Sequence, residues 1–164
     1  MKKLQKEDVF KYLEKVCDPE IPVLTILDMG IVRGVELNDK GVVVFITPTY
    51  TGCPAMKVIE EDIRNGLSPY IDGTIEIKTV FFPAWSTDWM SENGKEKLMA
   101  YGISPPGKTS GSEIFSFHKK EAAAICPLCK STDTVLKSFF GSTACKSLYF
   151  CNQCHQPFEH FKCI

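Results

Sequence analysis

The chain has 164 residues, of which 44% are hydrophobic, and a formal net charge of −1 at pH 7. This length suits one domain with a smaller module, and the hydrophobic fraction is sufficient for a core. The near-zero charge argues against a basic surface for nucleic acid or anionic membrane, and no apolar stretch approaches the ~20 residues of a membrane span. The charged, helix-like start "MKKLQKEDVFKYLEK" differs from a signal peptide, so we expect a cytoplasmic protein.

The first predicted element is an amphipathic helix over residues 5–17, because apolar residues recur at helical spacing before Pro19. The next segment, "DPEIPVLTILDMGIV", places Asp18, Glu20 and Asp28 in a long loop that is apolar between its ends. These acids are either metal ligands or acceptors that cap turns. The sequence leaves both roles open.

Three strands and two further helices follow. "IVRGVEL" and "VVVFIT" predict a hairpin with its turn at 39–41, and the second strand, apolar throughout, is expected to be central. "PAMKVIEEDIRNGL" has one apolar stripe and predicts a helix. "TIEIKTVF" alternates like a half-buried strand with Phe81 on its apolar side, and "SENGKEKLMAYG" predicts a helix capped by Ser91 and followed by Gly102. The order α-β-β-α-β-α is that of a two-layer sandwich.

The segment "FFPAWSTDWM" contains four aromatic side chains within nine residues. Exposed aromatic residues concentrate at binding sites. We therefore assign half of them to the core and the other half to a partner surface.

Cys53 lies between Gly52 and Pro54, where the central strand gives way to the second helix. Proline is favoured at the first helical position because its missing N–H would have no partner there, so Cys53 is the expected N-cap. Free N–H groups and the positive end of the helix dipole favour a thiolate, which is a better nucleophile or metal ligand than a thiol. A small buried side chain at a tight turn explains the same pattern equally well.

Six of the eight cysteines fall within the last 40 residues, and this distribution divides the chain into two modules. Between the modules, "ISPPGKTSGSE" is rich in Pro, Gly and Ser and predicts a linker. The predicted ranges are 1–103 for the α+β domain, 104–120 for the linker and 121–164 for a ribbon.

Two C-x-x-C pairs, Cys126 with Cys129 and Cys151 with Cys154, are separated by 21 residues. This spacing is typical of zinc ribbons, in which four thiolates form a tetrahedron. A module this small needs the metal to fold. Redox chemistry would instead require one pair on a βα turn of a thioredoxin-like unit, which the sequence lacks.

Cys145, Cys163 and His155 remain near the predicted zinc site. Neither cysteine completes another C-x-x-C pair, so they are candidates only for a second metal site, and Cys145 also fits a buried core thiol. His155 is expected to pack against the zinc site or donate a hydrogen bond rather than bind metal.

The motifs "DPEIP", "DMGIVRGV" and "TPTYTGCPA" resemble the iron-sulfur assembly domain of bacterial SUF-system accessory proteins, whose hallmark is a cysteine before a proline at a strand-to-helix turn. With "PAWSTDWM", "YGISPP", "CPLC", "FGSTACKSLYFC" and "HFKCI", the chain is similar to the family of the phenylacetyl-CoA epoxidase D subunit from about Val16 to its last residue. The resemblance implies an α+β assembly-type domain with a four-cysteine ribbon that holds structural Zn2+.

In function, the resemblance implies a non-catalytic accessory subunit that assists iron or iron-sulfur cluster assembly for the ring-epoxidising monooxygenase of aerobic phenylacetate catabolism. Cys53 would be the transient ligand, supported by loops that contain Asp18, Glu20, Asp28 and Thr49. Its partners would be the di-iron oxygenase and iron-sulfur reductase subunits. Because one thiol cannot hold a cluster alone, this role implies a homodimer or a shared site.

The residues themselves also argue against catalysis. The chain lacks the carboxylates with paired Glu-x-x-His motifs of a di-iron oxygenase, as well as a phosphate loop or a dinucleotide fingerprint. The alternative function is a docking subunit that holds oxygenase and reductase together without metal transfer. A nucleic-acid-binding ribbon would need a basic face, whereas the tail after residue 112 carries six Lys or Arg against four Asp or Glu.

Overall fold

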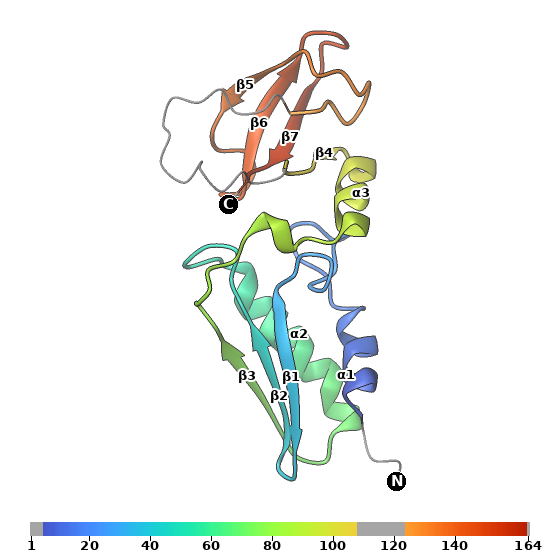
Figure 1. Cartoon of the computed structure of the whole chain (residues 1–164), viewed down its shortest axis with the longest axis vertical. Coiled ribbons are helices and arrows are strands. Elements are labelled where there is room, and N and C mark those ends of the chain that lie inside the picture. Colours follow the sequence, from blue (N-terminus) through green and yellow to red (C-terminus); the bar gives the residue numbers. More distant parts are fainter. Residues whose placement is uncertain (1–4, 108–123, 164) are drawn as a thin grey trace. The chain divides into compact units, whose positions relative to one another are not determined.

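The computed structural model describes residues 5–107 and 124–163, which form two compact units. The first unit extends to Trp85 and includes Trp89–Ser91, and the second contains Ser86–Asp88 and the chain from Glu92 onward. Figure 1 shows the helices and strands of both units, and their mixture confirms the predicted α+β class. Within the described ranges, no helix combines the length and the apolar character that crossing a bilayer requires.

A three-stranded sheet organises the first unit, with the order β1-β2-β3. β1 (Val32–Asn38) pairs antiparallel with β2 (Gly41–Ile46), and β2 pairs parallel with β3 (Thr74–Thr79). Val42, Val43 and Val44 of β2 are all buried. β2 is therefore the central strand, as its continuous apolar sequence predicts.

Two helices cover this sheet: α1 (Lys6–Leu13) contacts β1, and α2 (Ala55–Leu67) contacts α1 and β3. α2 buries Ile59, Ile63 and Leu67 on its predicted apolar face. The short 3-10 helix η1 (Ser68–Tyr70) then leads from α2 into β3.

Two predicted details of this unit are wrong. α1 ends at Leu13 instead of residue 17, because Val16 accepts a hydrogen bond from the N–H of Ile26 and the next residue forms a β-bridge with Thr25. Phe81 does not join the apolar side of the third strand. β3 ends at Thr79, and 64% of the Phe81 surface is exposed.

The aromatic segment after β3 is divided between the interior and the surface, as predicted. Trp85 is buried and its indole N–H donates to the backbone carbonyl of Met29 at 2.9 Å. The Arg33 guanidinium lies 3.9 Å from the centre of the Trp89 ring. Phe82 exposes 88% of its surface. That the exposed residues contact a partner stays a prediction.

The second unit contains α3 (Glu92–Tyr101), which directly follows Ser91 and is ended by Gly102 at φ +95°, as predicted. The 3-10 helix η2 (Thr87–Trp89) precedes it. A four-stranded sheet follows, in the order β4-β7-β6-β5. Its strands are β4 (Ile103–Ser104), β5 (Thr134–Ser138), β6 (Lys146–Cys151) and β7 (Pro157–Phe161).

β4 pairs with β7, so residues 103–104 belong to the ribbon's sheet. Most of the predicted linker and the first residues of the predicted ribbon, 108–123, lie outside the described residues. The domain ranges stay a prediction for that reason.

Packing between α1 and α2 gives a first test. A Cβ at Gly66 would overlap the ring of Tyr12, whose hydroxyl donates to the carbonyl of Asp62. Glycine inside a helix normally costs roughly 0.5–1 kcal/mol relative to alanine. Here we expect Gly66→Ala to lower the free energy of unfolding by about 1–3 kcal/mol, because the helices must move apart. Urea unfolding monitored by circular dichroism measures the change.

Asn65→Ala, one residue earlier on the exposed side of α2, is the matched control and should leave stability unchanged or raise it. In a Tyr12→Ala background, Gly66→Ala should become stabilising. A stabilised Gly66→Ala single variant would contradict the described packing.

Candidate functional site

Cys53 lies at the end of a tight turn that follows β2. Its N–H donates to the carbonyl of Tyr50 at 3.2 Å, and Gly52 has φ +83°. This is the pattern of a type II turn, in which the third position requires glycine. The Cys53 side chain is half-buried, so it reaches solvent.

The predicted cap position is wrong by one residue. α2 begins at Ala55 with Pro54 as its N-cap, and no side chain caps the helix. Pro54 already has helical dihedral angles, φ −67° and ψ −26°, so Cys53 is the last residue outside the helix.

The start of α2 has no acidic side chain to balance the positive end of its dipole. Its first turn contains no acidic residue, whereas the first turns of α1 and α3 contain Glu7, Asp8 and Glu92. The N–H groups at a helix start have no intrahelical partners and favour negative charge. Between β2 and Cys53, Thr49 is buried, and the Thr47 hydroxyl is buried without a hydrogen-bond partner among the described residues.

The acidic residues of the long loop make capping hydrogen bonds. The Asp18 carboxylate accepts the N–H groups of Glu20 and Ile21 at 2.8 and 2.9 Å. The Asp28 carboxylate accepts the Ser91 hydroxyl at 2.8 Å, and the Asp28 N–H donates to Thr25. These bonds match the capping alternative.

Across residues 5–107 and 124–163, three or more potential metal ligands meet only at the four ribbon cysteines. The structure therefore does not bring the loop acids together with Cys53 in one multi-ligand site. Their supporting role, and that of Thr49, stays a prediction.

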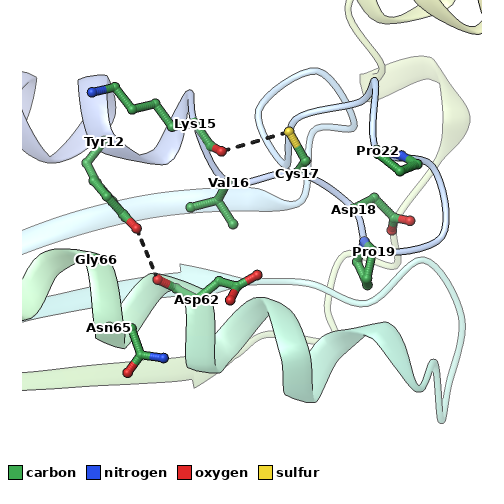
Figure 2. Close-up of a pocket in the computed structure, with 10 residues that line it drawn as sticks. All are labelled: Tyr12, Lys15, Val16, Cys17, Asp18, Pro19, Pro22, Asp62, Asn65 and Gly66. Carbon is green, nitrogen blue, oxygen red and sulfur yellow. Dashed lines mark hydrogen bonds between the residues drawn. The ribbon is translucent and has the colours of Figure 1, made fainter.

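An open groove of about 540 Å³ lies between the end of α1, the loop that follows it and the C-terminal half of α2. Figure 2 shows the residues that line it. Burial, and secondarily the negative charge of Asp62, raises the pKa of the Tyr12 hydroxyl, which stays protonated as a donor. Cys17 lines this groove, with its sulfur 3.8 Å from the Lys15 carbonyl. Cys53 is not among the lining residues, so the groove and the Cys53 turn are separate features.

The four cysteines of the two C-x-x-C pairs converge in the second unit. The sulfur atoms of Cys126 and Cys154 are 3.7 Å apart, those of Cys129 and Cys151 are 3.5 Å apart, and all four lie within 4.8 Å of one another. A tetrahedron with Zn–S bonds of ~2.3 Å has sulfur atoms about 3.8 Å apart. The set therefore fits Zn2+ and forms the zinc site of the ribbon.

The two cysteine loops have the same backbone geometry. Lys130 and His155, each directly after its C-x-x-C pair, have φ +64° and +56°. The N–H of each donates to the carbonyl of the first cysteine of its pair, both at 2.9 Å. The sequence did not predict this geometry, because left-handed positions are usually marked by glycine and neither residue is glycine.

His155 makes a backbone hydrogen bond and a ring contact next to the second cysteine pair. Its N–H is a donor in the second cysteine loop, and its ring centre lies 6.3 Å from that of Phe150. It does not belong to the four-ligand group.

The protonation of the zinc-site thiols depends on backbone donors, burial and the neighbouring thiols. The N–H of Cys154, opposed by burial, lowers the pKa of the Cys151 thiol to about 7, whereas burial and neighbouring thiols raise the pKa of Cys154 to about 12. Zinc requires all four as thiolates, so binding releases protons and the affinity for zinc falls as the pH falls.

Around the zinc site, Cys126 and Cys151 belong to a small core with Ala124, Tyr149 and Phe158. A cluster this small contributes little burial around the cysteines, so we expect the metal to supply much of the stability of the ribbon.

The two remaining ribbon cysteines lie apart from the zinc ligands. Cys145 is buried, as one alternative expected, with its sulfur 3.1 Å from the Thr143 hydroxyl. Cys163 is exposed, and its sulfur lies 3.7 Å from the Gly107 carbonyl. Neither belongs to the four-ligand group.

Comparisons with known proteins match both units. A family model described as an iron-sulfur cluster assembly protein matches residues 6–78, and one described as a PaaD zinc beta ribbon domain matches residues 110–162. The D subunit of the "Putative 1,2-phenylacetyl-CoA epoxidase" of Escherichia coli (strain K12) is 43% identical over 160 residues, which cover 98% of this chain and 94% of that protein.

Two shorter proteins match more than half of the chain. The Fe-S protein maturation auxiliary factor of Porphyromonas gingivalis is 36% identical over 96 residues, which cover 57% of this chain and 90% of that protein. A crystal structure of a domain of unknown function from Bacillus anthracis is 32% identical with a TM-score of 0.53, and the match covers 57% of this chain and 90% of that one.

Zinc removal tests the ribbon. We expect about one zinc ion per chain, and we expect Cys126→Ser or Cys151→Ser to release it and unfold the ribbon, because zinc contributes on the order of 10 kcal/mol to such modules. Metal analysis and hydrogen exchange resolved by peptide measure the two effects. Exchange in the first unit should not change, and Cys145→Ser should keep its zinc. A protected ribbon without metal would refute the interpretation.

His155 gives a sharper test of ligand identity. His155→Gly should retain the zinc and raise stability slightly, because glycine adopts φ +56° without strain. His155→Val should lower the thermal midpoint while retaining zinc, since a β-branched residue is strained there. Loss of zinc from the glycine variant would instead identify His155 as a ligand.

Proposed function

The chain belongs to the family of the phenylacetyl-CoA epoxidase D subunit, and on this premise we propose that it is an accessory component that assists assembly of iron or an iron-sulfur cluster for that monooxygenase system. The observation that carries the proposal is the match of one chain to two kinds of relative. Over 98% of its length it is similar to a protein named as an epoxidase subunit, and over 57% and 60% of its length it is similar to two proteins named as Fe-S maturation auxiliary factors.

Cys53 is the residue through which we expect iron to be handled. The turn from Tyr50 fixes its backbone, and the uncompensated start of α2 favours negative charge beside it. A single half-buried thiolate occupies one coordination position of iron and leaves the others to the donor and the recipient. This arrangement suits transfer better than storage.

The zinc site has a different task. Four thiolates close the coordination sphere of zinc, which is typical of structural sites. The ribbon also exposes Phe139 and Phe140, with the Lys162 ammonium 4.8 Å from the Phe140 ring centre. We infer that this surface recognises the oxygenase or reductase subunits, while Cys53 handles the metal.

A docking role without metal transfer is the second candidate, and the exposure of Phe82 favours it. Stable co-purification with oxygenase subunits, together with normal metal content in cells that lack the protein, would support docking. Under-metallated epoxidase or reductase in those cells would support maturation.

The maturation role predicts a specific effect of Cys53→Ser. Serine is close in size to cysteine and is tolerated before a helix, so we expect a change in unfolding free energy of at most ~1 kcal/mol. A hydroxyl cannot replace a thiolate as a soft ligand for iron. The variant should therefore fail to restore growth on phenylacetate in a deletion strain, while its zinc content and partner binding are unchanged.

Cys17→Ser is the matched control, because Cys17 is also half-buried in the first unit but lies in the groove away from the Cys53 turn. It should restore growth fully. Growth with Cys53→Ser equal to wild type would exclude the thiolate-transfer role and leave docking as the function.

A further inference from the structure

β3 forms one edge of the first sheet. It pairs with β2 on one side, and along the described residues no strand pairs with its other side (Figure 1). Exposed strand edges are templates for pairing with another chain, so most proteins protect them. The sequence of this edge shows what kind of chain it fits.

The direction of its backbone groups follows from two hydrogen bonds. The N–H of Thr74 donates to Lys40, and the N–H of Val80 donates to Ile46, so both point towards the β1-β2 hairpin. Because amide groups alternate in direction along a strand, those of residues 75, 77 and 79 point to the open side. The edge therefore presents three successive sets of donors and acceptors.

The side chains of β3 are complementary to themselves. In the strand sequence "TIEIKT", Glu76 directly precedes Ile77 and Lys78 directly follows it, so oppositely charged residues flank Ile77 on its two sides. We propose that β3 pairs antiparallel with β3 of a second copy of this chain, with Ile77 opposite its own equivalent. In this register Glu76 of each copy faces Lys78 of the other.

The backbone permits this register, and charge selects it over its two symmetric neighbours. The outward groups of Ile77 exchange two hydrogen bonds with their equivalents, which makes Glu76 and Lys78 a non-hydrogen-bonded pair, the kind with the closest side chains. The two neighbouring symmetric registers place Glu76 opposite Glu76 or Lys78 opposite Lys78, and like charges in these positions repel. In the single chain the Lys78 ammonium lies 3.4 Å from the Glu76 carboxylate. On dimerisation each of these residues would exchange this partner for the same residue type of the other copy.

The burial of the apolar side chains shows that a second β3 would have apolar surface to cover. Ile75 and Ile77 lie beside Val42 and Val44 of β2 in the sheet. The two valines are fully buried, whereas the two isoleucines are only half-buried. A second β3 would supply the missing neighbours on the outer side of this apolar row.

The proposed dimer has a consequence for the metal. The end of β2 aligns with Thr79, and the Cys53 turn follows that end of β2. Antiparallel pairing of β3 therefore places the two Cys53 turns at opposite ends of the joined sheet. The additional ligands for iron must come from donor and recipient proteins instead of a second Cys53. The dimer itself does not depend on the proposed function.

Charge reversal tests the pairing in the full-length, zinc-loaded protein. Sedimentation equilibrium should show a dimer for the wild type. Glu76→Lys and Lys78→Glu should each weaken dimerisation by about tenfold or more, because each creates two like-charge pairs. The double variant Glu76→Lys/Lys78→Glu should dimerise like the wild type, since both opposite-charge pairs are restored. An equimolar mixture of the two single variants should form mixed dimers.

Glu36→Lys makes the same charge change on β1, the opposite edge of the sheet, and should not affect dimerisation. Circular dichroism and zinc content establish that each variant is folded. A wild type that is monomeric at high micromolar concentration, single variants that dimerise normally, or a double variant that stays monomeric would each overturn the proposal.

Discussion

Hydrogen bonding on both sides of β2 is the constraint on which the first unit depends. β2 is bonded to β1 and to β3, so it is buried and its neighbours become the two edges of the sheet. Its final residues lead into the Tyr50–Cys53 turn, which fixes where the cysteine emerges. The central place of β2 therefore determines both the position of Cys53, the proposed iron ligand, and the edge of β3 with which no described strand pairs.

The ribbon cysteines and Cys53 differ in the number of potential ligands around them, and this difference separates a structural metal site from the proposed transfer role. In the ribbon, four sulfur atoms lie within 4.8 Å of one another, and a metal held by four protein ligands has no position for another molecule. Cys53 is outside any group of three or more potential ligands in the described parts of the chain. A metal bound there must complete its coordination with other molecules, which suits an auxiliary factor.

The acidic residues of the long loop show why composition alone does not identify a metal site. Asp18 satisfies the N–H groups two and three residues ahead, a local pattern that the sequence reveals in principle. Asp28 accepts a hydrogen bond from Ser91, 63 residues later. No local pattern reveals a partner so distant, so the sequence alone leaves the capping and metal-ligand roles of these acids open.

The sequence by itself determined the α+β class, the central strand, the apolar face of α2 and the four zinc ligands, because periodicity and C-x-x-C spacing are local properties. Tertiary structure decided where α1 ends, since the β-bridge between Cys17 and Thr25 requires extended backbone where a longer helix would continue. It also decided that Phe81 is exposed and that no described strand pairs with the outer edge of β3. These features depend on which distant residues compete for the same hydrogen bonds and the same buried space, and a local pattern does not contain that information.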